Sequence, residues 1–318
     1  MFPQYIILIM SKRLKVRFAV LTVLFLITIF SIYLVFQESK QGILTVAFLN
    51  IGQGDSIFIE APSGNQILID GGPGRGVLRE LSKVMPFYDR SIDVVLATHP
   101  DADHIGGLPD ILKKYKTEIF FEPGVETDTN MYKELEKLVS EKESAGKIKK
   151  IEARRGMVVD LGGGTILEIL YPVLDPRGME TNTASIVARL VYGENEFLLT
   201  GDSPVNIEDY LISQIPQGDT LGSLGPKGVT LGKGLPLGNL QADVLKAGHH
   251  GSRTSTSAEY VNAVQPEYVV ISAGKDNKYG HPHQEVLDVL NSAQAKILRT
   301  DQDGRIVFES DGVNLKLK

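Results

Sequence analysis

The sequence predicts an α/β domain, with sheets covered by helices, that follows one membrane-spanning helix. Three observations support this prediction. An uncharged apolar run occupies Phe18–Phe36, short apolar strands alternate with helices from residue 43 onward, and polar, histidine-containing motifs lie where several of those strands end. Alternating strands and helices are typical of α/β folds, in which helices cover the faces of the sheets.

The run Phe18–Phe36 has the length of a transmembrane helix, because at about 1.5 Å per residue it nearly crosses a hydrocarbon core of about 30 Å. Four basic residues precede it: Lys12, Arg13, Lys15 and Arg17. Since basic flanks stay cytoplasmic, we expect a cytoplasmic segment over 1–17, a single-pass anchor in the cell membrane over 18–36, a linker over 37–42 and an extracytoplasmic domain over 43–318. A cleaved signal peptide and translation from Met10 are the alternatives to this interpretation.

The amino-acid composition excludes several kinds of functional site in the domain. The chain has no cysteine, which excludes thiolate metal sites, disulfides and a cysteine nucleophile. Its net charge is −6, and the four basic residues before the apolar run leave the rest at about −10. A domain this acidic does not favour strong non-specific binding to a polyanion, so any contact with nucleic acid must be local.

Short apolar runs bounded by glycine or polar residues predict the strands. In chain order we expect them at Ile43–Ile51, Ser56–Ile59, Gln66–Asp70, Asp93–Thr98, Met157–Leu161, Thr165–Leu170, Ser185–Val191, Glu196–Thr200, Asp243–Lys246, Tyr268–Ser272, Lys296–Arg299 and Arg305–Glu309. Gly162–Gly164 and Gly193–Asn195 supply hairpin turns. Helical spacing of apolar residues predicts helices at Leu108–Tyr115, around Met131–Val139, at Ser257–Val264 and at His283–Leu290.

Two glycine-rich segments interrupt this alternation. Gly71–Gly76 does not have the spacing of a phosphate-binding loop, and no Lys-Ser/Thr pair follows it. Residues 215–240 are rich in Gly, Pro and Leu and lack a helical period, which predicts a long loop or an insertion, with a lid over the site as one interpretation.

All six histidines fall in three short motifs: THPDADH with His99 and His104, LKAGHHGS with His249 and His250, and YGHPH with His281 and His283. The first motif places four potential ligands within six residues, including Asp101 and Asp103, directly after an apolar strand. Imidazoles and carboxylates together suit divalent ions. The residues therefore predict a metal-centred hydrolase.

The order of motifs VAFLNIGQGDS, LIDGG, THPDADHIGG, LLTGD, LKAGHHGS and YGHPH resembles the metallo-β-lactamase superfamily. Within it, the chain looks most similar to the extracytoplasmic hydrolase domain of ComEC-type competence (DNA-uptake) proteins, from about Leu44 to about Phe308. The resemblance implies a four-layer αββα sandwich with a dinuclear metal site at one edge.

The resemblance also implies roles for individual residues. His99 and Asp101 would bind a first metal, Asp103 and His104 a second, and Asp202 would bridge the two while positioning the nucleophile together with Asp103. One histidine of the His249–His250 pair would complete the second site. Neighbours on an extended segment point opposite ways, so the other would support the site or meet substrate. Asp70 resembles the aspartate that braces the metal loop, with a simple turn aspartate as its alternative.

This sequence departs from many members of the superfamily at two ligand positions. Many members carry a further histidine before the bridging aspartate, and none stands between His104 and His249 here. Asn182 could offer a carbonyl oxygen at that position, or water could fill it. The second ligand is Asp101 instead of histidine. The expected cofactors are therefore two divalent ions, Zn²⁺ or Mn²⁺ with Mg²⁺ possible, since oxygen-rich sites favour harder ions.

Residues around the later motifs could contact substrate. Ser252, Arg253 and Ser255 could hold an anionic group, with a solvated loop as the alternative. His281 is our candidate proton donor or oxyanion partner. His283 opens a helix and could bind phosphate. A helix-entry role without chemistry is the alternative for both histidines.

The leading hypothesis is a membrane-anchored phosphodiesterase or nuclease that acts outside the cytoplasmic membrane by metal-assisted hydrolysis. Single-stranded DNA or another phosphodiester is the expected substrate, and membrane proteins are possible partners. There are two alternatives, the first a different hydrolase on the same scaffold and the second a protein of another class. One is a hydrolase of an envelope phosphoester, a lactone or a β-lactam, and the other is a non-catalytic binding module on the same fold.

Overall fold

The computed structural model describes residues 12–40, 42–215 and 238–318. The chain divides into two units, 1–41 and 42–318. In the predicted glycine-rich insertion over 215–240, residues 216–237 lie outside the described residues. The first unit contains helix α1 (Lys12–Lys40), of which Arg13–Ile32 is long and apolar enough to cross a membrane. Residues 37–40 of the predicted linker over 37–42 continue the helix, because no glycine or proline stands between Lys12 and Gln41.

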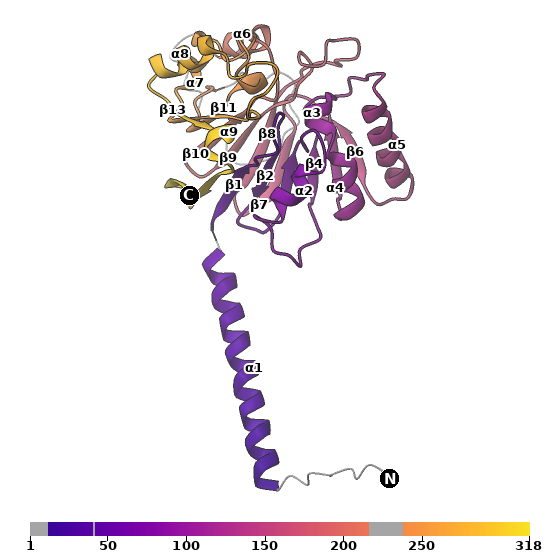
Figure 1. The fold of residues 1–318 in the computed structure, drawn as a ribbon, viewed down its shortest axis with the longest axis vertical. Helices are drawn as coiled ribbons and strands as arrows, with labels where there is room; N and C mark the ends of the chain where they lie inside the picture. Colours follow the sequence, from indigo (N-terminus) through magenta and orange to yellow (C-terminus); the bar gives the residue numbers. More distant parts are fainter. Residues whose placement is uncertain (1–11, 41, 216–237) are drawn as a thin grey trace. The chain divides into compact units, whose positions relative to one another are not determined.

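The second unit is built on two mixed sheets (Figure 1). The first sheet has the order β15 (Leu315–Leu317), β14 (Ile306–Ser310), β1 (Leu44–Phe48), β2 (Ile57–Glu60), β3 (Gln66–Ile69), β4 (Val94–Leu96), β5 (Ile119–Glu122) and β6 (Lys149–Glu152). The second has the order β13 (Lys296–Arg299), β12 (Tyr268–Ile271), β11 (Val244–Lys246), β10 (Asn195–Leu199), β9 (Val187–Tyr192), β8 (Thr165–Tyr171) and β7 (Val158–Gly162).

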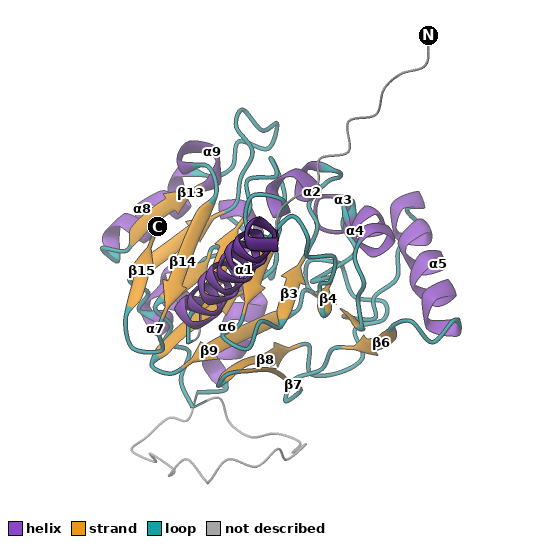
Figure 2. Cartoon of the chain, turned by 90° about the horizontal axis from the view of Figure 1, so that it is seen from below, coloured by secondary structure: helices purple, strands orange, loops and turns teal. Residues whose placement is uncertain are grey.

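Helices cover the outer face of each sheet (Figure 2). The first sheet packs against α2 (Gly76–Leu81), α3 (Ala102–Ile105), α4 (Leu108–Lys114) and α5 (Asn130–Ser144). The second packs against α6 (Val205–Ser213), α7 (Ala258–Val264) and α8 (Gln284–Ser292), and a short α9 (Thr300–Asp303) follows β13. The predicted four-layer αββα sandwich is confirmed.

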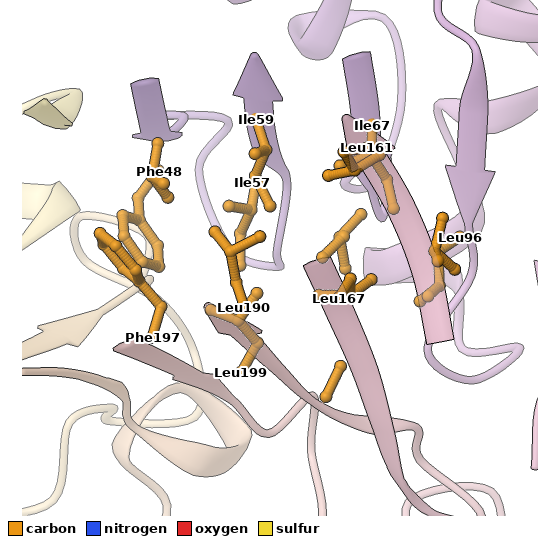
Figure 3. Packing of buried hydrophobic residues seen from close by; sticks show 14 of the residues in the cluster. Phe48, Ile57, Ile59, Ile67, Leu96, Leu161, Leu167, Leu190, Phe197 and Leu199 are labelled. Carbon is orange, nitrogen blue, oxygen red and sulfur yellow. The ribbon is translucent and has the colours of Figure 1, made fainter. Parts of the chain in front are cut away.

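The main core lies between the two sheets. Alternate residues of each strand point inward, so that Phe48 and Ile57 of the first sheet face Leu190 and Phe197 of the second (Figure 3). The rings of Phe197 and Phe308 meet edge to face with centroids 5.8 Å apart. This interlocked apolar layer fixes how the two sheets lie against each other, and thus where their strand ends meet.

Several elements were absent from the prediction. The strands β5, β6 and β15 and the helix α2 are short, and their apolar residues show neither a clean period of two nor one of 3.6. β6, for example, has the sequence KKIE and becomes a strand by pairing with β5 at the edge of the sheet. Tertiary pairing overrides weak local preference in such segments. Helix α6 was overlooked, although its buried Ile207 and Leu211 stand four residues apart.

The ends of the parallel strands position the functional residues. β3 and β4 run parallel and lead into Asp70 and Thr98, while β10 and β11 run parallel and lead into Asp202 and Gly248. A backbone hydrogen bond of 2.9 Å from Ile186 N to Thr98 O joins the two sheets at this edge. The carboxyl edges of both sheets therefore face one common site.

Candidate metal centre

Four imidazoles surround one carboxylate oxygen at this edge. The Nε2 atoms of four histidines lie near Oδ2 of Asp202, at 3.2 Å for His104, 3.3 Å for His250, 3.8 Å for His249 and 3.9 Å for His99. Asp202 is 3% exposed, and His99, His104 and His250 are buried. The fold thus brings residues that lie up to 151 positions apart in the sequence around a single oxygen atom.

Each of these rings is held from behind through its Nδ1 atom. His104 Nδ1 lies 2.8 Å from Asp70 Oδ2, and His250 Nδ1 donates to the carbonyl of Ser272 at 2.9 Å. His99 and His249 pair with the hydroxyls of Thr98 and Thr254 at 3.0 and 3.2 Å, respectively. Partners on one ring nitrogen fix the ring orientation and turn the other nitrogen inward, as around protein-bound metals.

The two aspartates of the THPDADH motif complete two groups of donors around Asp202. Asp103 Oδ2 lies 3.4 Å from His250 Nε2, beside His104. Asp101 Oδ2 lies 3.8 Å from His99 Nε2. Both aspartates are partly exposed, at 31% and 38%, so this side of the site opens to solvent. The arrangement divides into a group with Asp103, His104 and His250 and a group with Asp101 and His99, which share Asp202.

Two observations indicate that these groups suit cations. His99 Nε2 and Asp202 Oδ1 are buried and have no hydrogen-bond partner among the described residues, although buried polar atoms rarely stay unpaired. Burial opposes a charge on His104 and on His250, yet the carboxylates around them, Asp202 first, overcome this and raise both pKa values well above the ordinary range. The pocket therefore draws positive charge to the positions where metal ions would bind.

The carboxylates themselves are held ionised. Burial opposes the charge of Asp202, but the adjacent His250 and His104 lower its pKa well below the usual range. For Asp103, burial would raise the pKa, but the hydrogen bond from His250 and the charges of His104 and His250 together outweigh it and lower the pKa to about 2. His99 differs, because burial and the neighbouring His104 lower its pKa well below the ordinary value. It is a neutral imidazole, the form that binds metals.

We expect metal binding to release protons. Because the pKa values of His104 and His250 are raised, both rings carry protons at neutral pH that a bound ion must displace. Affinity for Mn²⁺ or Zn²⁺ should therefore increase as the pH rises from 6 to 8. Calorimetric titration in two buffers with different ionisation enthalpies measures the number of protons released. Identical heats in the two buffers would contradict this.

Asp70 supports the loop that carries the THPDADH motif. It is fully buried, accepts from Thr98 N at 2.8 Å and from Thr98 Oγ1 at 2.7 Å, and holds His104 Nδ1. Its backbone has a positive φ of 59°, which an aspartate tolerates better than most residues. The alternative interpretation of Asp70 as a simple turn residue is too limited, because its carboxylate holds both Thr98, just after β4, and the His104 ring.

Substitution Asp70→Asn should lower metal affinity by about 10- to 100-fold, the usual cost of losing such a supporting partner. An amide at this position would lose the charge that orients His104. Titration calorimetry with Mn²⁺ measures the effect, and the exposed Asp160→Asn serves as the matched control. Unchanged affinity in Asp70→Asn would show that His104 does not depend on this carboxylate.

The prediction that His249 and His250 lie on an extended segment was wrong. Both residues lie in a 3₁₀ turn, Gly248–Gly251, with positive φ angles of 48° and 56°. Residues in this strained region cluster at functional sites. The turn brings both Nε2 atoms toward Asp202, with His250 buried and His249 27% exposed. His250 lies in the group with Asp103 and His104, and His249 lies at the solvent-exposed mouth of the site.

The remaining predicted residues lie around the mouth of the site. The His281 ring lies 5.6 Å from that of His249 and 6.2 Å from that of His250, centroid to centroid. Burial and the charges of His250 and His249 lower the pKa of His281 to about 4. The ring is therefore neutral at pH 7, which suits a hydrogen bond to a developing oxyanion better than proton donation. His283 precedes α8, and its Nδ1 accepts from Arg253 N at 3.1 Å.

Other predicted contacts are divided between the mouth and the interior. Asn182 Oδ1 is buried without a partner among the described residues, and the adjacent Thr181 hydroxyl bonds to Asp101. Ser252 is buried and hydrogen bonded to Thr254 at 3.0 Å. Ser255 donates to the carbonyl of Ser203 at 2.9 Å, so its hydroxyl is not free to hold an anion. Arg253 is exposed and lies 3.6 Å from Glu285.

Sequence reasoning missed a buried ion pair behind the rings. The ammonium of Lys246, at the end of β11, contacts Asp55 Oδ2, donates to Gly201 O at 2.8 Å and lies 3.6 Å from Asp202 Oδ1. Lys246 is 0% exposed and Asp55 1%. A lysine inside an otherwise apolar strand was the available sign, since lysine is almost never fully buried unless paired.

Asp55 lies within reach of His104, His250 and Asp202, and these four could also hold an ion. Its carboxylate, however, faces the Nδ1 atoms of the two rings, at 3.9 Å from His104 and 3.4 Å from His250. Burial would raise the pKa of Asp55, but Lys246 and His250 lower it below the ordinary range. We therefore assign Asp55 to the support behind the centre, with Lys246 as its cation.

Comparison with known proteins agrees with this arrangement. The family "Metallo-beta-lactamase superfamily" matches residues 49–275. ComE operon protein 3 of Bacillus subtilis (strain 168) is 32% identical over 308 residues, which cover 90% of this chain and 35% of that protein. Competence protein ComA of Neisseria gonorrhoeae is 28% identical over 269 residues, which cover 83% of this chain and 32% of that protein. The chain thus spans about a third of the length of these relatives.

Among solved structures, similarity extends to Igni18, a metallo hydrolase from the archaeon Ignicoccus hospitalis, with a TM-score of 0.47, 15% identity, and coverage of 83% of this chain and 98% of that chain. The family match covers more than half of the chain, and the sandwich and the order of motifs agree with it. The chain belongs to the metallo-β-lactamase superfamily and has ComEC-type competence proteins among its relatives.

Proposed function

We propose that this chain is a membrane-anchored, metal-dependent phosphodiesterase whose catalytic domain lies outside the cytoplasmic membrane. The observation that carries the proposal is the convergence of four imidazole Nε2 atoms on Asp202 Oδ2, within 3.9 Å. Divalent ions bound there would lower the pKa of water and offset negative charge on a phosphoryl group. Two ions fit the two groups of donors, and Zn²⁺ or Mn²⁺ suits their mixture of nitrogen and oxygen.

The mouth of the site favours an anionic substrate. His281 and His283 present two further imidazoles there beside His249, with the His281 and His283 rings 4.8 Å apart. The exposed Tyr279 stacks on His281 at 5.6 Å, and Lys278 Nζ lies 5.0 Å from the Tyr279 ring centroid. Such donors can bind the non-bridging oxygens of a phosphodiester, and an aromatic ring beside them can contact a nucleobase. Single-stranded DNA is therefore one proposed substrate.

Residues of the chain would share the work at the reacting phosphate. Asp202 and Asp103 are held ionised and would position the ions and the attacking water. Neutral His281 would donate a hydrogen bond to a phosphoryl oxygen that gains charge, and a preorganised donor of this kind is worth about 10²-fold or more in rate. DNA passage is not part of this proposal, and a role in uptake would require membrane partner proteins.

Activity assays on the full-length protein test this function. With Mn²⁺ or Zn²⁺ added, we expect hydrolysis of bis(p-nitrophenyl) phosphate and of a single-stranded oligonucleotide, and loss of both activities in Asp103→Ala. Asp128→Ala, on the exposed surface, should keep both activities. Cleavage of nitrocefin alone would favour a lactamase instead. Metal binding without any turnover would favour a binding module.

A further inference from the structure

The turn between α2 and β4 exposes two aromatic side chains. Asp89 N donates to Pro86 O at 3.0 Å, so Pro86–Asp89 forms a β-turn with Phe87 and Tyr88 at its two central positions. These side chains are 84% and 74% exposed, the highest values among large hydrophobic residues in the described part of the domain. Glycine, proline, asparagine and aspartate are the usual residues at such positions, so the turn itself does not require aromatic rings.

The turn is firmly supported. The Asp89 carboxylate accepts from Gln66 Nε2 at 2.7 Å, from Ser91 N at 3.0 Å and from Ser91 Oγ at 2.9 Å. The rings of Phe87 and Tyr88 contact each other edge to face, with centroids 5.5 Å apart. A fixed turn therefore presents an apolar tip, and the fold offers it nothing to pack against within the described residues.

Strand register places this tip at one particular edge of the first sheet. Gln66, which holds the turn, begins β3 and pairs with Glu60, and Glu60 pairs with Thr45 near the start of β1. The tip thus lies where the chain enters the domain. The metal centre lies at the opposite edge, beyond the ends of β3 and β4 at Asp70 and Thr98. Val313, which is 61% exposed, follows Ser310 of β14, the residue paired with Leu44, at the same entry edge.

The connection to α1 is short. α1 ends at Lys40 and β1 begins at Leu44, and the four Cα-to-Cα steps between these two residues span at most about 14 Å when fully extended. If α1 crosses a membrane through the apolar run that ends at Phe36, the helical residues 37–40 add about 6 Å to this limit, so the covalent connection keeps the entry edge within about 20 Å of the lipid surface. Tyrosine is well suited to the membrane interface, where its ring is apolar and its hydroxyl is wet, and phenylalanine adds apolar surface that can insert into the acyl boundary. The exposed Arg90 beside the turn suits anionic headgroups.

We propose that Phe87 and Tyr88 form a lipid-contacting tip that inserts into the interfacial region of the bilayer in which α1 is anchored. This inference rests on the membrane anchoring within the proposed function. The tip and α1 would be two separate points at which the chain contacts the membrane.

Tryptophan fluorescence tests the proposal directly, because the chain has no tryptophan. Full-length protein carrying Phe87→Trp is reconstituted in vesicles with lipids brominated near the headgroup. We expect blue-shifted emission, quenching by bromine, and protection from aqueous acrylamide. The matched control is Leu174→Trp, because Leu174 is also highly exposed, at 72%. The first residues of β8 lie near the entry edge, and Leu174 follows the last residue of this strand, so it lies at the opposite edge. Its emission should stay solvent-like and be quenched by acrylamide.

The outcomes separate this proposal from the function on which it rests. Equal emission and equal bromine quenching for the two variants, in protein that stays with the vesicles after an alkaline wash, would overturn the lipid tip and leave the anchor intact. Loss of the protein from the vesicles in that wash would overturn both. Phosphodiester hydrolysis is measured separately and does not depend on either result.

Discussion

Substitution Asp202→Asn should reduce phosphodiester hydrolysis by at least about 10³-fold, which corresponds to roughly 4 kcal/mol of transition-state stabilisation. The physical reason is the position of this carboxylate. Its Oδ2 lies within 3.9 Å of all four Nε2 atoms, so it is the only group among the described residues that both donor groups share. An amide in its place removes the negative charge that holds the two groups together.

The same substitution should lower the number of bound ions, measured by elemental analysis after dialysis. It should also lower the pKa of His104 and His250, because Asp202 is the first of the charges that raise those pKa values. Histidine signals in NMR titrations report this second effect without any activity measurement. Asp128→Asn, an aspartate on the surface, is the control. Wild-type ion content and activity in Asp202→Asn would contradict the assignment of this residue.

Substitution Lys246→Met should destabilise the domain by about 3–5 kcal/mol, the usual cost of removing one partner from a buried ion pair. Methionine fills a similar volume, so the loss is electrostatic. Without the ammonium, Asp55 is a buried charge, and the carbonyl of Gly201 and Asp202 Oδ1 lose their cation. Chemical denaturation of the full-length protein measures the change in unfolding free energy.

The double substitution Asp55→Asn with Lys246→Met should restore much of that stability, because Asp55 is then uncharged and the buried Asp202 still has His104 and His250 beside it. The control is Lys133→Met, which removes the exposed partner of Asp128. Its unfolding free energy should change by about 1 kcal/mol or less, as is usual for surface ion pairs. A loss of less than about 1 kcal/mol in Lys246→Met would show that the buried pair is not a stabilising contact.

The sequence predicted the parts of the site that lie close together along the chain. THPDADH contains four donors after one strand, and the LLTGD and LIDGG motifs each place an aspartate at a strand end. These residues could be predicted to belong to a metal site because local spacing and strand direction determine where they lie. The sandwich followed from the order of those motifs more than from periodicity, since short strands such as β5 and β6 carry little periodic pattern.

The parts that could not be predicted depend on contacts between distant segments. Asp55 and Lys246 meet although 191 positions separate them, and neither residue has a local pattern that names its partner. The inward rotation of both His249 and His250 arises from positive φ angles, which residue type alone does not specify for histidine. The choice between neighbouring histidines therefore required the folded structure.

Anomalous X-ray diffraction from crystals of the protein grown with Mn²⁺ is the most direct test of the central claim, that these residues form a metal centre. We expect anomalous density beside Asp202 Oδ2, contacted by Nε2 of His104 and His250 and by Asp103, and a second peak beside His99 and Asp101. His104 Nδ1 should remain on Asp70. Crystals that bind Mn²⁺ without density near Asp202, or with density only between Asp55 and Lys246, would contradict this claim.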